Sequence, residues 1–264
     1  MMKAVISSLG LIFLTSLPGV SAPLIWTGAT PDLSVASNWN PASVPTISDN
    51  ATFNAASTTK QLLTPGGTDF SVASATFTSG NFSFAASGFG DVINFGNGVS
   101  GGGLVLSSTA TVDFNDQFIF LNNNMSWSVS GGSQFSSSGT VDTTNDGNDT
   151  GYALTLAFGV GQTNNRATFQ DVTFGTTGTL TVTNWGGTPG QFGGVNNQLR
   201  FFGDGSQPPD LTNIKFTVGA STLSSTAQNF GSYWEVVPVP EPATCFLLAG
   251  GMACLGILRH RRII

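Results

Sequence analysis

Apolar and small polar residues alternate along most of the chain between its two ends. Every second side chain of such a segment lies on one face of an extended strand, which is typical of half-buried β-strands. No stretch between residues 23 and 238 has the apolar spacing of a helix. The pattern therefore predicts a body built of β-strands. The clearest predicted strands cover residues 74–78, 81–84, 103–107, 126–129 and 179–183.

Clusters of Gly, Asn, Asp and Ser separate the predicted strands. These residue types form turns and tolerate positive φ. Short strands at this spacing fit two architectures, a β-solenoid of stacked rungs or a two-sheet β-sandwich. Both are all-β, and the periodicity leaves the choice open. The turn clusters are residues 66–67, 88–90, 97–98, 101–103, 131–132 and 146–147.

The N-terminal end has the three parts of a secretory signal peptide. Lys3 gives a positive start, residues 4–17 are apolar, and Val20-Ser21-Ala22 supplies the small residues of a cleavage site. We therefore expect signal peptidase to remove residues 1–22 by cutting after Ala22. The alternative is an uncleaved N-terminal anchor.

The C-terminal end has a different order of parts. A proline-rich stretch, residues 238–242, precedes an apolar run from Ala243 to Leu258 and a basic end, residues 259–262. The run can enter a bilayer, and the arginines resist leaving the cytoplasmic side. As a helix it spans about 24 Å, less than the roughly 30 Å hydrocarbon core, which favours a temporary anchor. The alternative is a permanent C-terminal anchor.

This tail resembles the PEP-CTERM sorting signal. The matching parts are the motif Pro240-Glu241-Pro242, the apolar helix of residues 243–258, and the basic residues Arg259, Arg261 and Arg262. The resemblance implies that an exosortase recognises and processes the tail. It implies transient anchoring in the inner membrane, followed by a cell-surface or extracellular location. The expected host is a bacterium with an outer membrane and an exopolysaccharide system.

Short motifs recur along the body at residues 26–28, 37–40, 45, 49–53, 75–84 and 124–135. They resemble motifs of autotransporter-associated β-strand repeat proteins. That resemblance implies a right-handed parallel β-solenoid (β-helix), which we prefer to the two-sheet β-sandwich. In a solenoid, inward side chains stack in register on neighbouring rungs. The expected inward positions are Phe77, Leu104, Phe118, Trp127 and Phe169.

These features divide the chain into four parts. Residues 1–22 are the signal peptide, 23–179 the β-solenoid body, 180–237 a closing β segment, and 238–264 the sorting tail. The closing segment resembles the region that often precedes the Pro-Glu-Pro motif in exported proteins of this kind. A cap of this sort protects an open solenoid end from edge pairing. The alternative, a ligand site in this segment, has no supporting constellation in the sequence.

The body is acidic and has no cluster of basic residues along the sequence. Every Asp and Glu except Glu241 lies in it, so that its net charge is about −9. Such a charge argues against nucleic acid as a partner. Both cysteines, Cys245 and Cys254, lie in the apolar tail, so the body has no thiol for a disulfide or a metal. The basic residues of the body are Lys60, Arg166, Arg200 and Lys215.

The residue inventory argues against most catalytic sites. The sole histidine, His260, lies in the basic tail, so the body can form neither a Ser-His-Asp triad nor an ordinary zinc site. Asp113 and Asp116 are close in sequence, and glycoside hydrolysis needs two carboxylates. Residues three apart in a strand point to opposite faces, so we interpret these acids as solvent-facing. We expect no cofactor and no enzymatic activity.

An Asp-rich loop is the one candidate metal site. Asp142, Asp146 and Asp149 are crowded around Gly147, and Ca²⁺ takes six to eight oxygen ligands. The loop lacks the glutamate of a helix-loop-helix calcium site, since the twelfth position is Ala153. We therefore interpret it as a solvated loop and expect no metal.

Three classes of function follow. The preferred one is a non-catalytic structural or adhesive protein of the cell surface or extracellular polysaccharide matrix. The second is a carbohydrate-binding module that uses exposed tryptophans, although packing in the core or end cap is the favoured role for them. The third is a polysaccharide lyase or hydrolase that uses acids of the body with Arg166 or Arg200, supported by fold analogy. The tryptophans in question are Trp26, Trp39, Trp185 and Trp234.

Overall fold

The computed structural model describes residues 23–64, 69–86, 91–96, 102–115, 118–144, 150–194, 197–203 and 208–239. The predicted signal peptide with its cleavage site at Ala22 lies outside these residues. So do the motif Pro240-Glu241-Pro242, the apolar run of residues 243–258 and the basic residues Arg259, Arg261 and Arg262. Within the described ranges, no helix is long and apolar enough to cross a membrane.

The described body is all-β, as predicted, with one short 3-10 helix, η1 (Ala36–Asn38). Its strands form two sheets. The first sheet has the order β19 (Ser221–Leu223), β18 (Ile214–Val218), β16 (Thr179–Thr183), β14 (Ala153–Phe158), β12 (Met125–Val129), β9 (Leu104–Leu106), β6 (Ser74–Phe77), β3 (Asn50–Phe53), β1 (Leu24–Trp26), β2 (Trp39–Asn40). The second sheet has the order β20 (Ser225–Asn229), β21 (Tyr233–Pro238), β17 (Gln198–Phe202), β15 (Arg166–Thr173), β13 (Gln134–Asp142), β10 (Thr111–Asn115), β7 (Asn81–Ala86), β4 (Gln61–Thr64), with a branch of β5 (Phe70–Val72), β8 (Val92–Phe95) and β11 (Phe118–Leu121).

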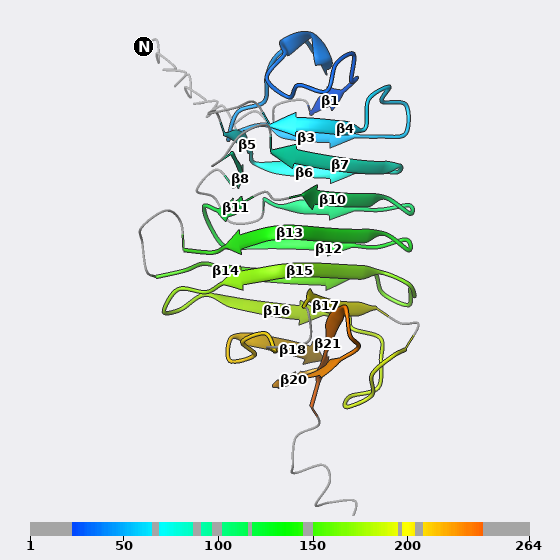
Figure 1. The fold of residues 1–264 in the computed structure, drawn as a ribbon, viewed down its shortest axis with the longest axis vertical. Coiled ribbons are helices and arrows are strands. Elements are labelled where there is room, and N and C mark those ends of the chain that lie inside the picture. The colour runs from blue at the N-terminus through cyan, green and yellow to red at the C-terminus, as the bar shows by residue number, and fades with distance from the viewer. Residues whose placement is uncertain are drawn as a thin grey trace, which may run out of the picture.

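The chain passes from one sheet to the other and back as it advances. Within each sheet, a strand pairs in parallel with the strand that the chain formed on its previous pass. For example, β6 pairs with β3 before it and β9 after it, while β10 pairs with β7 and β13. The strands therefore follow one another along the long axis of the molecule, from blue to orange in Figure 1.

In-register pairing aligns side chains of the same kind in rows. In the first sheet one inward row is apolar throughout, because each parallel partner repeats the alternation of its neighbour. The rings of Phe53 and Phe77 stack with centroids 4.6 Å apart. The strands predicted near residues 74–78, 103–107, 126–129 and 179–183 are confirmed. The row consists of Phe53, Phe77, Leu106, Val129 and Phe158.

The core lies between the two sheets. Trp127 of β12 in the first sheet contacts Phe135 and Phe169 of the second sheet, with ring centroids 5.2 and 6.2 Å apart. All three side chains are buried. Aromatic contacts of this kind join the inner faces along the stack, so one apolar interior is shared by both sheets.

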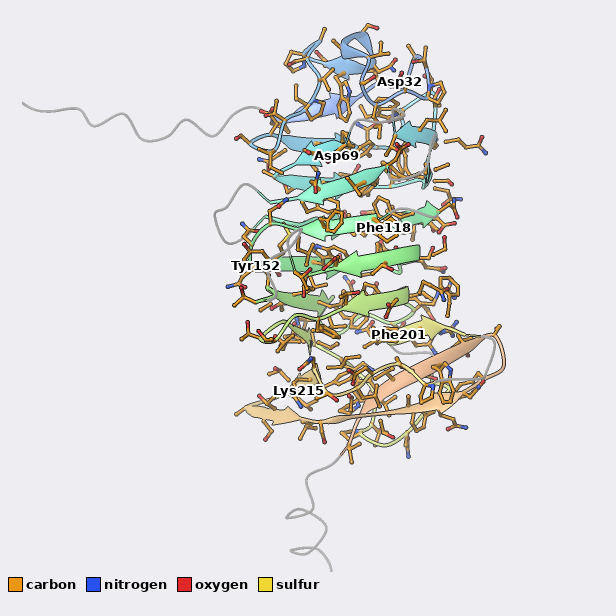
Figure 2. All side chains as sticks on the ribbon, turned by 60° about the vertical axis from the view of Figure 1, so that its left-hand side comes forward. Asp32, Asp69, Phe118, Tyr152, Phe201 and Lys215 are labelled. Atoms are coloured by element: carbon orange, nitrogen blue, oxygen red, sulfur yellow. The ribbon has the colours of Figure 1, made fainter. Side chains whose placement is uncertain are left out.

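Four of the five predicted inward positions are confirmed, and the fifth is wrong. Phe77, Leu104, Trp127 and Phe169 are buried, whereas Phe118 is 45% exposed on β11 (Figure 2). In β11 the next residue and Leu121 are buried instead. A shift of one residue moves every side chain of a strand to the other face, and this apolar run gives no alternation that fixes the phase.

Antiparallel strands stand at both ends of the parallel stack. At the N-terminal end, β2 pairs with β1, and the indole of Trp26 donates to the Thr59 carbonyl at 2.9 Å. At the C-terminal end, β19 pairs with β18, and β21 pairs with both β17 and β20. These hairpins occupy strand edges that would otherwise be open to a further strand.

Glycines allow the tight turns between the sheets. Gly131 and Gly132 follow β12 with φ of 70° and 79°, which confirms the turn predicted there. A Cβ on Gly131 would lie 2.6 Å from the backbone nitrogen of Ser108 in the neighbouring turn. A larger residue would therefore be strained by its backbone and by this contact.

Candidate binding groove on the second sheet

Two rows of polar side chains run across the outer face of the second sheet. They arise because the outward positions of β7, β10, β13, β15 and β17 are paired in register. Neighbouring positions in a row are about 4.8 Å apart, the spacing between paired strands. The first row is Asn81, Thr111, Gln134, Arg166 and Gln198, and the second is Ser83, Asp113, Ser136, Thr168 and Arg200.

Two arginines on adjacent strands form the centre of this face. Arg166 of β15 donates from Nη2 to Oε1 of Gln134. Arg200 of β17 donates from Nη2 to Oε1 of Gln198 at 2.6 Å. The Cζ atom of Arg200 lies 3.9 Å from the centre of the Tyr233 ring, a cation–π contact. Both guanidinium groups are thus positioned by uncharged partners.

Neither arginine forms an ion pair with a carboxylate among the described residues. The nearest acid in the strand pairing is Glu235 of β21, which lies opposite Arg200. Its carboxylate is buried and accepts a hydrogen bond from the Gly193 backbone N–H at 2.7 Å. The Glu235 carboxylate is therefore hydrogen-bonded to the backbone and forms no ion pair with Arg200.

The two positive charges act on each other. Partial burial lowers the pKa of the Arg166 guanidinium from its ordinary value, and the charge of Arg200 lowers it further. Tyr233 has the opposite, weaker effect on this pKa. An arginine stays protonated despite such a shift, so the face holds two adjacent positive charges in an acidic body.

A groove runs over the two arginines. It is a cavity of about 410 Å³, and we call it the arginine groove. Asp113 and Ser136 of the outer rows line it on one side, and Phe202, Ser232 and Tyr233 line it on the other. Phe202 is 37% exposed, so part of its ring is open to solvent. The groove thus combines two cations with hydroxyl groups and an apolar ring.

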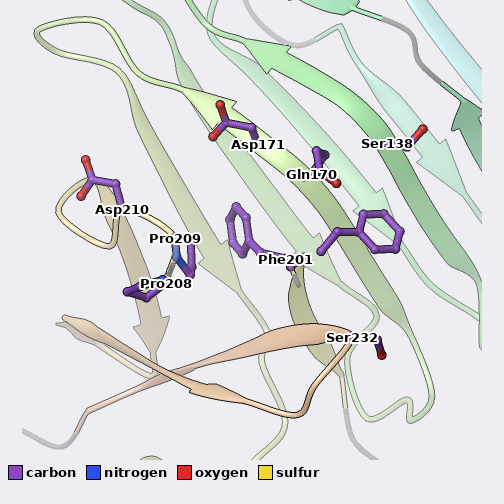
Figure 3. Close-up of a pocket in the computed structure, with 10 residues that line it drawn as sticks. Ser138, Gln170, Asp171, Phe201, Pro208, Pro209, Asp210 and Ser232 are labelled. Carbon is purple, nitrogen blue, oxygen red and sulfur yellow. The ribbon is translucent and has the colours of Figure 1, made fainter. Parts of the chain in front are cut away.

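A second cavity of about 780 Å³ adjoins the groove and shares Phe202 and Ser232 with it. Figure 3 shows this cavity between β15, the loop with Pro208 and Pro209, and the end of the hairpin at Ser232. Together the two cavities extend across several strands of the outer face. The open space is therefore longer than one small anion requires.

Two carboxylates line the adjoining cavity, and each accepts a hydrogen bond from the backbone N–H of a residue that follows it. Asp171 accepts from the Val172 N–H at 2.8 Å, and Asp210 accepts from the Thr212 N–H at 2.9 Å. The backbone hydrogen bond from Thr212, followed by its side-chain hydrogen bond, lowers the pKa of Asp210. Both acids line the adjoining cavity and place negative charge there.

The tryptophans considered for sugar stacking do not line the groove. Trp26, Trp39 and Trp185 are buried, and Trp234 is half-buried. Trp39 donates to the Leu33 carbonyl at 3.0 Å, and Trp185 packs edge-on against Phe216. The first three therefore serve the packing role that the sequence favoured.

The structure describes two of the acids singled out in the sequence, Asp113 and Asp142. Asp113 lines the arginine groove and accepts from the Ser136 hydroxyl at 2.8 Å, while Asp116 lies outside the described residues. Asp142 accepts from the backbone and hydroxyl of Thr144, both at 2.7 Å. The other candidate calcium ligands, Asp146 and Asp149, lie outside the described residues as well. In the described ranges, no three His, Cys, Asp or Glu residues are grouped closely enough to hold a metal.

Both arginines were candidate residues from the sequence, but no local pattern places them together. One signal was present, a repeat of 32 residues that separates Gln134 from Arg166 and Asn165 from Asn197. Each pair occupies equivalent positions on successive passes of the chain. Recognising this period aligns Arg166 with Gln198, which leaves Arg200 one position further along the same face.

Comparison of the chain with protein-family models, with curated proteins and with solved structures found no match.

Proposed function

We propose that the chain is an exported, exosortase-processed, non-catalytic structural or adhesive protein of the cell surface or extracellular polysaccharide matrix. Export and processing rest on the two ends of the sequence. The observation that carries the structural role is one apolar interior along the whole stack, enclosed by outer rows of mainly Ser, Thr, Asn and Gln. Such a body presents long, regular faces to its surroundings and suits attachment or display.

We also propose that the body is a right-handed parallel β-solenoid, with the closing segment as its cap. In support, strands of successive passes pair in parallel, with one register shift in β13, and between the two antiparallel ends the chain passes repeatedly from one sheet to the other. A β-sandwich is normally built from antiparallel strands, so this pairing favours the solenoid. The antiparallel hairpins at β19, β20 and β21 fit the role of an end cap.

The first experiment expresses the tagged full-length chain in hosts with and without an exosortase. Intact mass spectrometry of membrane and medium fractions follows the product. We expect loss of the tail near residues 240–242 only when exosortase is present, with the body appearing outside the cell. A Glu241→Ala variant, which alters the motif and leaves the apolar run intact, is the matched control and should be retained.

A full-length product held in the membrane of both hosts would contradict the proposal. The tail would then be a plain anchor. Processing that is equally efficient in the Glu241→Ala variant would also contradict it, because the motif would not be what the enzyme recognises.

Carbohydrate binding is a second candidate function, and the arginine groove is the observation that favours it. Two guanidinium groups beside hydroxyl and amide side chains suit a ligand that bears both carboxylates and hydroxyls.

A further inference from the structure

We propose that the arginine groove binds an acidic polysaccharide in which uronic acid residues alternate with neutral sugars. Arg166 and Arg200 would contact carboxylates of the uronic acids, and the flanking polar side chains would contact neutral sugars. The inference rests on the proposed function only for the extracellular setting in which the polymer is met. It concerns this groove alone and is independent of how the tail is processed.

Neither arginine of the groove is in an ion pair among the described residues. Two of the four basic residues in a body of net charge about −9 lie on adjacent strands, without a carboxylate partner among the described residues. Like charges this close repel each other and cost stability. A bound carboxylate removes that repulsion, and a guanidinium binds carboxylates through two parallel hydrogen bonds.

Arg200 has hydrogen-bond donors that its protein partners do not use. A guanidinium has five N–H donors, and Gln198 accepts from only one nitrogen of this group. Its Nε atom is buried without a hydrogen-bond partner. The contact with Tyr233 holds the planar group in a fixed orientation. The side chain is therefore preorganised, which reduces the entropic cost of binding, and its remaining Nη hydrogens are the donors left for a ligand.

Carboxylates lie close to the two arginines on this face. Asp113 lines the arginine groove itself, and Asp171 and Asp210 line the adjoining cavity. A polymer with a negative charge on every unit would meet these acids. In a polymer whose carboxylates are separated by neutral sugars, the carboxylates can bind the arginines while the neutral sugars lie near the acids. Nucleic acid is disfavoured for the same reason, since it bears a phosphate at each nucleotide.

The lining of the groove matches the chemistry and the length of a chain of sugars. Gln134, Ser136 and Ser232 offer amide and hydroxyl groups for sugar hydroxyls, and Phe202 offers an exposed ring face for the apolar side of a sugar. The adjoining cavity extends the space beyond the two arginines. These features fit an extended chain of sugars better than a single small anion.

The test measures binding of the full-length chain, in detergent micelles, to polygalacturonan by calorimetry. Three preparations differ only in methyl esterification: partly esterified, fully esterified and free acid. We expect the partly esterified polymer to bind most tightly and the fully esterified one at least tenfold more weakly. Arg166→Gln and Arg200→Gln should each weaken binding about tenfold, because each removes a charge-assisted contact. Arg166→Lys keeps the charge but loses the two-pronged geometry, so it should be intermediate.

Lys215→Gln on the first sheet is the matched control and should bind like the wild type. Circular dichroism melting confirms that each variant is folded, and Arg166→Gln and Arg166→Lys test the proposal even where Arg200→Gln does not fold. Equal affinity for the fully esterified polymer would overturn the proposal. So would wild-type affinity in the folded Arg166 variants, or tighter binding of single-stranded DNA or polyglutamate. The exosortase experiment has a separate readout, so failure there and failure here are distinguishable.

Discussion

The outer faces of the two sheets are built by the same strand pairing and carry different chemistry. On the first sheet an outward row contains small uncharged residues throughout. On the second sheet the corresponding rows contain two arginines and an aspartate, and a groove lies over them. The row on the first sheet is Thr52, Thr76, Val105, Ser128, Ala157, Thr183 and Thr217.

This difference distinguishes the outer residues that strand pairing requires from those that are available for binding. The uncharged row of the first sheet forms regular parallel ladders, so charged outer residues are not required for pairing. Lys215 lies in the other outward row of this sheet, opposite Thr181. Arg166 and Arg200 repel each other on the second sheet, which makes them a cost to the fold. Residues that are unfavourable for folding and grouped in a groove are candidates for binding.

The largest expected effect comes from the interior that both faces share. Trp127→Ala should lower the free energy of unfolding by about 3–5 kcal/mol, because it leaves a cavity between aromatic rings of both sheets. Chemical denaturation followed by fluorescence and circular dichroism measures this change. Phe118→Ala is the control, since Phe118 is exposed, and it should cost less than about 1 kcal/mol. Similar losses in the two variants would mean that the sheets do not share one core.

A smaller effect is expected at the turn that leads into the second sheet. Asn165 is buried, accepts from the Gly132 N–H at 2.9 Å and donates to Oδ1 of Asn197 at 2.7 Å. Asn165→Ala leaves both partners without these bonds, so we expect a loss of about 1–3 kcal/mol in the free energy of unfolding.

Thr163→Ala, an exposed change in the same turn, is the matched control and should leave this free energy within about 0.5 kcal/mol of the wild type. An Asn165→Ala protein as stable as the control would show that these hydrogen bonds do not hold successive passes of the second sheet together.

The strands were predictable from sequence because their signal is local. Alternation in residues such as Ser74 to Phe77 states directly which side chains face inward. Phe118 was misplaced because Phe118 to Leu121 is a continuous apolar run, and such a run does not fix its own phase.

The groove was not predictable in the same way because it depends on distant residues. Arg166 and Arg200 become neighbours only through the register of β15 with β17. Tyr233 lies beside Arg200 because β21 pairs antiparallel with β17. No short-range sequence pattern predicts that pairing. The sequence contains the two arginines and the tyrosine, but only the strand topology brings them close together.

The charge difference between the two faces can be measured directly. A double-mutant cycle with Arg166→Gln and Arg200→Gln should give an unfavourable coupling of about 0.5 kcal/mol between the arginines. Raising the salt concentration should shrink this coupling, because salt screens exposed charges. The same cycle between Lys215 on the first sheet and Arg166 should give no coupling. A favourable coupling between the arginines would mean that a shared partner already neutralises them.

The smallest expected effect concerns the wall of the adjoining cavity, where Asp210 accepts hydrogen bonds from Thr212. These bonds lower the pKa of Asp210 in the folded state, so the stability that they provide is present above its unfolded pKa of about 3.9. That contribution is lost as the pH falls through the lower folded pKa. Asp210→Asn keeps the side-chain shape and removes the charge, so at pH 7 it should be less stable than the wild type by about 0.3 kcal/mol, because Asp210 is exposed. The difference should vanish near pH 2, and thermal unfolding at both pH values would measure it; a difference that grows in acid would show that the carboxylate is not stabilised by its charge.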